Sequence, residues 1–238
     1  MSKKTKTFKY ILIVIVLALF IGLIIYLFPV IKNLSTPEGQ LEFKNQIANL
    51  GILGYLALFG LQFAQIFLIV LPGEPMEILA GMCYGGIGGL VFITISVLII
   101  TTIIFWAVRK FGRKFVYSFC SKEKIDKIEH SKLFQNPKKI ECIMLILFLI
   151  PGTPKDLLVY IGGLLPVKPL RFILISTFAR IPSVISSTFA GSNLVAGNWK
   201  FSIIIYGITF IIVGIIIFII NKFDKDKTAE EAMKVMKD

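Results

Sequence analysis

The sequence predicts an all-α, polytopic membrane protein with four spanning helices and two oppositely oriented re-entrant hairpins that form an inverted repeat. Hydrophobic residues make up 56% of its 238 residues, and the mean hydropathy is +0.83. Several apolar runs approach the roughly 20 residues that a helix needs to cross hydrocarbon. These runs are continuous, whereas the strands of a membrane β-barrel alternate polar and apolar residues. A proline- and glycine-containing pattern interrupts two of the runs at corresponding points.

The first apolar run, residues 10–30, follows a lysine-rich N-terminus. It is long enough to span, and no small-x-small cleavage site follows it, so we predict an uncleaved anchor helix that starts in the cytoplasm. Residues 32–50 are then an external, partly amphipathic connection. Together these segments form a first region, residues 1–50.

The basic stretch at residues 109–139 decides which later runs cross the membrane. It carries ten Lys or Arg against three acids, which marks a cytoplasmic loop. If residues 51–70 and 76–108 each crossed once, this loop would lie outside. We therefore predict that the chain enters from outside, turns at "LPGEP", returns, and crosses only over residues 88–108.

The same charge argument predicts a second hairpin over residues 140–165, which enters from inside and turns at "IPGTP". Residues 170–192 then cross outward and residues 201–220 cross back. Both termini are expected in the cytoplasm of a multi-pass protein of the cell membrane. The hairpins define a central domain, residues 51–195, and residues 196–238 hold the last span and a charged tail.

The two hairpin turns carry the same sequence pattern, "LPGEPMEILAG" from Leu71 and "IPGTPKDLLVY" from Ile150. Opposite orientation of two related hairpins is typical of an inverted repeat. Irregular backbone at membrane depth needs polar partners from protein or a water-filled cavity, so we expect the two turns to meet in a polar cavity. The aligned positions are Pro72, Gly73, Pro75, Glu77 and Leu79 with Pro151, Gly152, Pro154, Asp156 and Leu158.

The residues at these turns suit an anion. Pro75 and Pro154 lie where returning helices would begin, and the free amides of helix starts attract negative charge. Arg180 falls about ten residues into its predicted span, close to mid-bilayer. The expected substrate-binding residues are Arg180, Lys155, Gly73 and Gly152.

Three acids accompany these cations. Glu74 and Glu77 are three residues apart and would share a helical face, and Asp156 takes the place of Glu77 in the second copy. Charges inside a membrane are costly and tend to mark substrate or proton paths, so we assign proton coupling to all three acids. The alternative, that they cap helices and form internal ion pairs with no substrate, stays open.

Several other functions are disfavoured. The net charge is +12, and the basic residues lie mainly at the ends of apolar segments and in one loop. This distribution is typical of residues that orient a protein in the membrane rather than of a nucleic-acid-binding surface. The cysteines, Cys83, Cys120 and Cys142, have no metal-ligand spacing, so no metal or cofactor is expected. The chain has one His and neither HExxH nor GxSxG, so we predict that it is not an enzyme. Two hairpin acids would suit aspartyl intramembrane proteolysis, but the surrounding sequence does not resemble it.

Four stretches resemble the DedA superfamily, also called the SNARE-associated Golgi protein or VTT-domain family: "LPGEPMEILAGMCYGGIGG", "AVRKFGRKF", "IPGTPKDLLVYIGGLLPVKPLRF" and "ARIPSVISSTFAG". The resemblance covers roughly residues 51–195 and implies two facing re-entrant hairpins and lipid translocation, in some members coupled to protons. Glu74 matches an acid that follows Pro-Gly in many members. Many bacterial members carry arginines where this chain has Phe148 and Pro154, which moves the expected phosphate contacts to Arg180 and Lys155.

We therefore expect a transporter that moves an anionic lipid or lipid-linked phosphate, such as a polyprenyl phosphate or a phospholipid, between leaflets. The expected partners are membrane lipids with anionic head groups, and homo-oligomerisation is left open. A small-ion or proton antiporter and a non-transporting scaffold are the alternatives. Arg109 lies at the cytoplasmic end of its predicted span, and whether it is functional or a topology anchor is also left open.

Overall fold

The computed structural model describes residues 36–69, 72–119, 122–123, 125–126, 137–150 and 153–223. Every regular element in these ranges is helical, which confirms the predicted all-α class. The predicted anchor at residues 10–30 lies outside the described residues. The chain divides into two compact units, residues 1–46 and 47–238, and α2 (Pro37–Asn49) lies mostly in the first.

The second unit begins with α3 (Ile52–Leu68), which ends at a left-handed residue, Ile69, before the first repeated turn. The next helix, α4 (Glu74–Phe111), contains 38 residues and breaks at Gly85, where φ is 78°. This conformation strongly favours glycine. A Cβ at Gly89 would lie only 2.8 Å from the backbone nitrogen of Gly81, so the chain folds back on itself here. We call residues 74–84 the first arm and residues 86–111 the long segment of α4.

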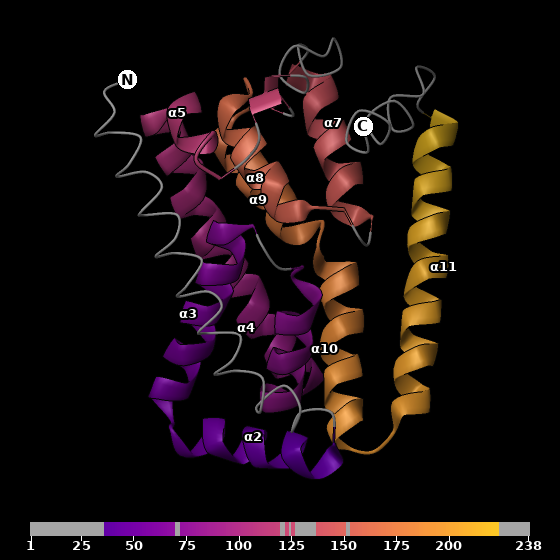
Figure 1. Cartoon of the computed structure of the whole chain (residues 1–238). Helices are drawn as coiled ribbons and strands as arrows, with labels where there is room; N and C mark the ends of the chain where they lie inside the picture. Colours follow the sequence, from indigo (N-terminus) through magenta and orange to yellow (C-terminus); the bar gives the residue numbers. More distant parts are fainter. Residues whose placement is uncertain are drawn as a thin grey trace, which may run out of the picture. The chain divides into compact units, whose positions relative to one another are not determined.

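The second half of the unit follows α5 (Arg113–Val116). Helix α7 (Pro137–Leu149) leads to the second repeated turn, and α8 (Lys155–Leu164) leads away from it. Helices α9 (Pro169–Phe178) and α10 (Ile181–Val195) are nearly continuous, with an interruption at Ala179 and Arg180. Pro182 supplies no N–H to the helical ladder, which accounts for the break. After a short turn, α11 (Trp199–Phe223) runs antiparallel beside α10 (Figure 1).

The two halves pack across each other. The first arm of α4 touches α10 backbone to backbone, since a Cβ at Gly81 would lie 2.0 Å from the Thr188 carbonyl oxygen and one at Gly191 would lie 2.1 Å from that of Ile78. Conversely, α8 of the second half packs on the long segment of α4 in the first half, because a Cβ at Gly163 would lie 2.6 Å from the Val108 side chain. Each short arm therefore packs on a long helix of the other half.

Two stretches of the described residues are long and apolar enough to cross a membrane, α4 and the combined α9–α10 stretch, Pro169–Val195. The bent pair of α2 and α3 would be a third candidate if counted as one span. Predicted spans 88–108 and 170–192 fall within the first two, and predicted span 201–220 falls within α11. The chain is thus a helical membrane protein, while the count of four spans and the two hairpins stay predictions.

The long segment of α4 has one buried and one exposed apolar face. Val91, Ile95, Ile99 and Ile103 recur at four-residue spacing and are 43–53% exposed, as a lipid-facing stripe would be. The opposite face enters the core, which also includes side chains of α7, α8 and α9. Its largest members are Tyr160, Phe105, Phe148 and Phe172.

Candidate functional site

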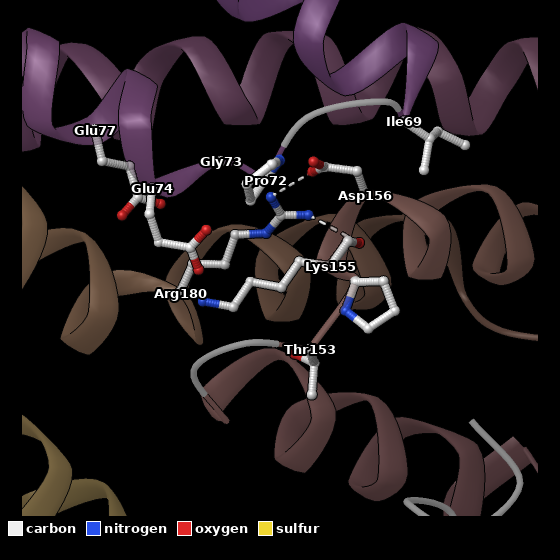
Figure 2. Close-up of a pocket in the computed structure, with 10 residues that line it drawn as sticks. Ile69, Pro72, Gly73, Glu74, Glu77, Thr153, Lys155, Asp156 and Arg180 are labelled. Atoms are coloured by element: carbon white, nitrogen blue, oxygen red, sulfur yellow. Dashed lines mark hydrogen bonds and ion pairs between the residues drawn. The ribbon is translucent and has the colours of Figure 1, made fainter. Parts of the chain in front are cut away.

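The two repeated turns meet at a cavity of about 260 Å³ inside the second unit (Figure 2). The first turn and first arm contribute one wall, and the second turn with α8 contributes another. All of the predicted site residues that the structure describes lie at this cavity, and Gly152 lies outside the described residues. The lining residues are Ile69, Pro72, Gly73, Glu74, Glu77, Thr153, Pro154, Lys155, Asp156 and Arg180.

Arg180 is the most enclosed cation at this cavity, with only 5% of its surface exposed. It lies in the break between α9 and α10, and its Nη1 is 3.0 Å from Asp156 Oδ1. Its Nη2 donates to the Lys155 carbonyl oxygen at 3.1 Å, and the guanidinium lies 5.1 Å from the centre of the Phe148 ring. Its Nε has no hydrogen-bond partner among the described residues. Arg180 therefore keeps one buried donor free.

Asp156 is held on both of its carboxylate oxygens. Oδ1 pairs with Arg180, and Oδ2 accepts a hydrogen bond of 2.6 Å from Gln65 Nε2. Gln65 in turn accepts one from Gln62 at 3.3 Å. These two glutamines of α3 were not among the predicted site residues. Their signal was two amides three residues apart within the apolar run 51–70, where buried polar groups are costly and need partners.

Lys155 is bonded differently from Arg180. Its ammonium donates to the Ser183 hydroxyl at 2.5 Å, and that hydroxyl donates to the Arg180 carbonyl oxygen at 2.9 Å. The side chain is buried and extends along the cavity toward Glu74 (Figure 2). It forms no ion pair of 4 Å or less with a described carboxylate. Its charge is therefore available to an anion in the cavity.

Glu77 is the acid with unused hydrogen-bonding capacity. It is 7% exposed, and its Oε2 has no partner among the described residues. Lys155 and Ser187 are its polar neighbours from the other half. An unsatisfied buried polar group costs about 1–3 kcal/mol, so a site with both a free acceptor and a free arginine donor is suited to a ligand or a proton. Glu74, also predicted, lines the same cavity and is half-buried.

Both helices that leave the turns begin at the cavity, as predicted from their prolines. Pro75 lies in the first turn of α4, and Pro154 immediately precedes α8. Neither helix start has a side-chain cap, which leaves its first amides without one of their usual partners. Thr153 closes the end of α7 instead, because its hydroxyl contacts the Leu147 and Ile150 carbonyl oxygens at 2.6 and 2.9 Å.

Arg109 does not line this cavity. Its Nη2 donates to the Leu165 and Val167 carbonyl oxygens at 2.9 and 2.8 Å, and its guanidinium lies 5.1 Å from the centre of the Phe105 ring. It therefore ties the end of α4 to the connection between α8 and α9. This contact gives Arg109 a structural role beyond the topology signal that its position predicts.

A family model for the VTT domain matches residues 71–193. The chain belongs to the VTT-domain family. This is the DedA/SNARE-associated Golgi protein family that its motifs resemble, and the match includes both repeated turns and Arg180. Members of the VTT-domain family are generally non-enzymatic membrane proteins. No curated protein and no solved structure matched the chain significantly.

Proposed function

We propose that this VTT-domain protein moves an anionic lipid or a lipid-linked phosphate between membrane leaflets, with proton coupling through the cavity acids. The observation that carries the proposal is the buried Arg180, which keeps Nε free beside the lysine ammonium in a cavity among apolar helices. Buried intramembrane charges of this kind tend to mark substrate paths.

The proposed architecture has two re-entrant hairpins, α3 with the first arm of α4 and α7 with α8. The crossed packing supports it, because each returning arm lies against a long helix of the other half, as an inverted repeat requires. The long segment of α4, the α9–α10 stretch, α11 and the predicted anchor would be the four spans. We propose that both termini are cytoplasmic and that the membrane is the cell membrane.

In the proposed mechanism a phosphate binds between Arg180, Lys155 and the helix starts near Gly73 and Gly152. Arginine and lysine both attract phosphate, and arginine adds a directional fork. Asp156 orients Arg180, since both of its oxygens are already bonded. Because Asp156 is already bonded, we assign proton uptake mainly to Glu77, whose Oε2 is free, and in second place to Glu74. Release of the phosphate then depends on which acids are protonated.

The test is lipid movement in proteoliposomes that contain fluorescent phosphatidylglycerol, measured by accessibility to an impermeant quencher. Arg180→Ala should abolish movement, and Arg180→Lys should keep part of it because the charge remains. Arg171→Ala is the matched control, since that arginine is exposed and pairs with Glu141 on the surface. Glu77→Gln should flatten the pH dependence of the rate. Parent-like movement by folded Arg180→Ala protein would refute the proposal.

A proton or small-ion antiporter is the second candidate, and the free Glu77 Oε2 is the observation that favours it. The same proteoliposomes separate the two, because an antiporter would move ions while the labelled lipid stayed in its leaflet. A protein that moves neither would fit the scaffold alternative.

A further inference from the structure

Helix α10 carries a row of buried hydroxyls that leads away from the cavity. Ser183 begins it, with its contact to the Lys155 ammonium. Most of these hydroxyls bond to the backbone of their own helix, as Ser186 does with the Ser183 carbonyl oxygen. Ser187 differs, because its oxygen accepts a hydrogen bond of 3.2 Å from Tyr206 on α11. Ser187 thus connects the cavity side of α10 to the next helix.

The other neighbour of Ser187 is Glu77. The hydroxyl is 1% exposed and is a polar neighbour of the Glu77 carboxylate, whose Oε2 is buried and has no hydrogen-bond partner among the described residues. Among the described residues no group accepts a hydrogen bond from the Ser187 hydroxyl within 3.5 Å, so its proton is unassigned beside the Glu77 carboxylate. The order of groups is therefore tyrosine hydroxyl, serine hydroxyl, carboxylate, with each donor next to an acceptor.

Tyr206 lies where this chain of groups reaches the periphery. It is partly exposed, and it lies on α11, beyond the residues that the family model matches. At 1.5 Å per residue, it is roughly 10 Å along α11 from Trp199 and the short turn that follows α10. Ser202 holds this part of α11 on α10, since its hydroxyl donates to the Ala190 carbonyl oxygen at 3.1 Å.

We propose that Tyr206 and Ser187 form a proton path to Glu77, so that the last helix completes the site of the VTT domain. One proton moves from the Tyr206 hydroxyl to the Ser187 oxygen while the Ser187 proton moves to Glu77 Oε2. Tyr206, whose side chain is partly exposed, then takes a proton from water that reaches its hydroxyl, and the reverse sequence discharges Glu77. No proton is gained or lost by the two hydroxyls over a full transfer.

The charge of Glu77 also depends on the other groups that face it. Glu74 lies on the same arm, Lys155 comes from α8, and Arg180 lies at the start of α10. Lys155 and Arg180 attract the charged form of this carboxylate, a phosphate that competes for them weakens that attraction, and the path then supplies the proton. This inference rests on the proposed coupling of lipid and proton movement, and its test must therefore follow the two separately.

The test uses the full chain in liposomes that contain phosphatidylglycerol and a trapped pH dye. Proton uptake is measured after a pH step, and lipid movement is measured at equal pH on both sides. Tyr206→Phe keeps the ring and removes the hydroxyl, and Ser187→Ala removes the next one. Both should slow proton uptake roughly 100-fold, the lower end of what a positioned proton donor contributes, while lipid movement at equal pH persists.

Ser202→Ala is the matched control, because it removes a hydroxyl from the same pair of helices without touching the path. It should leave both rates unchanged. Parent-like proton uptake by Tyr206→Phe, or an equal loss in the Ser202→Ala control, would overturn the path. A parent that moves lipid without protons also overturns it and leaves lipid transport standing. A parent that takes up protons but moves no lipid, with the Tyr206→Phe loss intact, rejects lipid transport and supports the path.

Discussion

Asp156→Asn tests the assignment of this acid to orienting Arg180 rather than to accepting protons. The substitution keeps the shape of the side chain and removes its charge, so the buried guanidinium loses its closest counter-charge, at 3.0 Å. The two side chains are only 6% and 11% exposed, and breaking such a pair typically costs about 3–5 kcal/mol. We expect a loss of about 3 kcal/mol, at the lower end of this range, for two reasons. The asparagine oxygen at this position still accepts the hydrogen bond from Gln65, and the Glu77 carboxylate lines the same cavity as the guanidinium.

Thermal unfolding of the purified protein in detergent measures this loss. For a chain of this size, 1 kcal/mol corresponds to roughly 2–4 °C, so Asp156→Asn should lower the Tm by roughly 6–12 °C. Glu141→Gln is the control, since it breaks the ion pair with Arg171, whose side chain is 61% exposed. Exposed pairs contribute about 0–1 kcal/mol, which predicts a loss below about 4 °C.

The double variant Asp156→Asn, Arg180→Gln sharpens the test. With both charges removed, no uncompensated ion remains buried, so the double variant should be more stable than Asp156→Asn alone. If Asp156→Asn shifts the Tm no more than Glu141→Gln does, the pair is not a fixed structural contact. Asp156 would then return to the group of acids free to exchange protons.

Two further predictions concern packing. Gly81→Ala should destabilise the protein by about 1–3 kcal/mol in the same unfolding assay, because the first arm and α10 must separate by roughly 1.4 Å to restore ordinary contact. Gly60→Ala, in open space on α3, should be neutral or stabilising, and equal losses in the two would contradict the packing. Arg109→Gln should cost about 1 kcal/mol, because Arg109 is itself exposed but contacts two carbonyl oxygens. Lys110→Gln, at an exposed position without such contacts, should stay within about 0.5 kcal/mol, and parent-like stability of Arg109→Gln would refute the role of Arg109 in holding α4 to the connection between α8 and α9.

Repetition in the sequence was enough to predict which residues meet. The gapless match of two proline–glycine turns in apolar runs, and the cost of acids there, predicted one polar cavity. Of the aligned residues, Pro72, Gly73, Glu77, Pro154 and Asp156 line it. Charge counting likewise predicted two spans that fall within α4 and the α9–α10 stretch, both long and apolar enough to cross a membrane. Both predictions depend on large energetic costs: irregular backbone and charged side chains are unfavourable in lipid, and basic loops favour the cytoplasm. Few arrangements of the chain in the membrane satisfy these constraints.

The different roles of the acids could not be predicted in this way. The repeat makes Asp156 the counterpart of Glu77, yet α3 supplies Gln65 to the former and no comparable partner to the free oxygen of the latter. Tyr206 was equally out of reach, since its contact with Ser187 depends on the rotation of α11 about its own axis. Such pairings are set by tertiary packing, which periodicity does not encode.

The glycine contacts divide the second unit into parts that would move differently during the proposed transport. The first arm and α10 are locked together at Gly81 and Gly191, whereas α8 is seated on the long segment of α4. Among the described residues, the reversal at Gly85, in open space, and the break before α10 are the joints between these two bodies. The ion pair of Arg180 with Asp156 bridges them. In the proposed transport, this ion pair would hold the two bodies together while the cavity is empty. It would break when an incoming phosphate binds the guanidinium, so that binding of the phosphate would also allow the two bodies to move relative to each other.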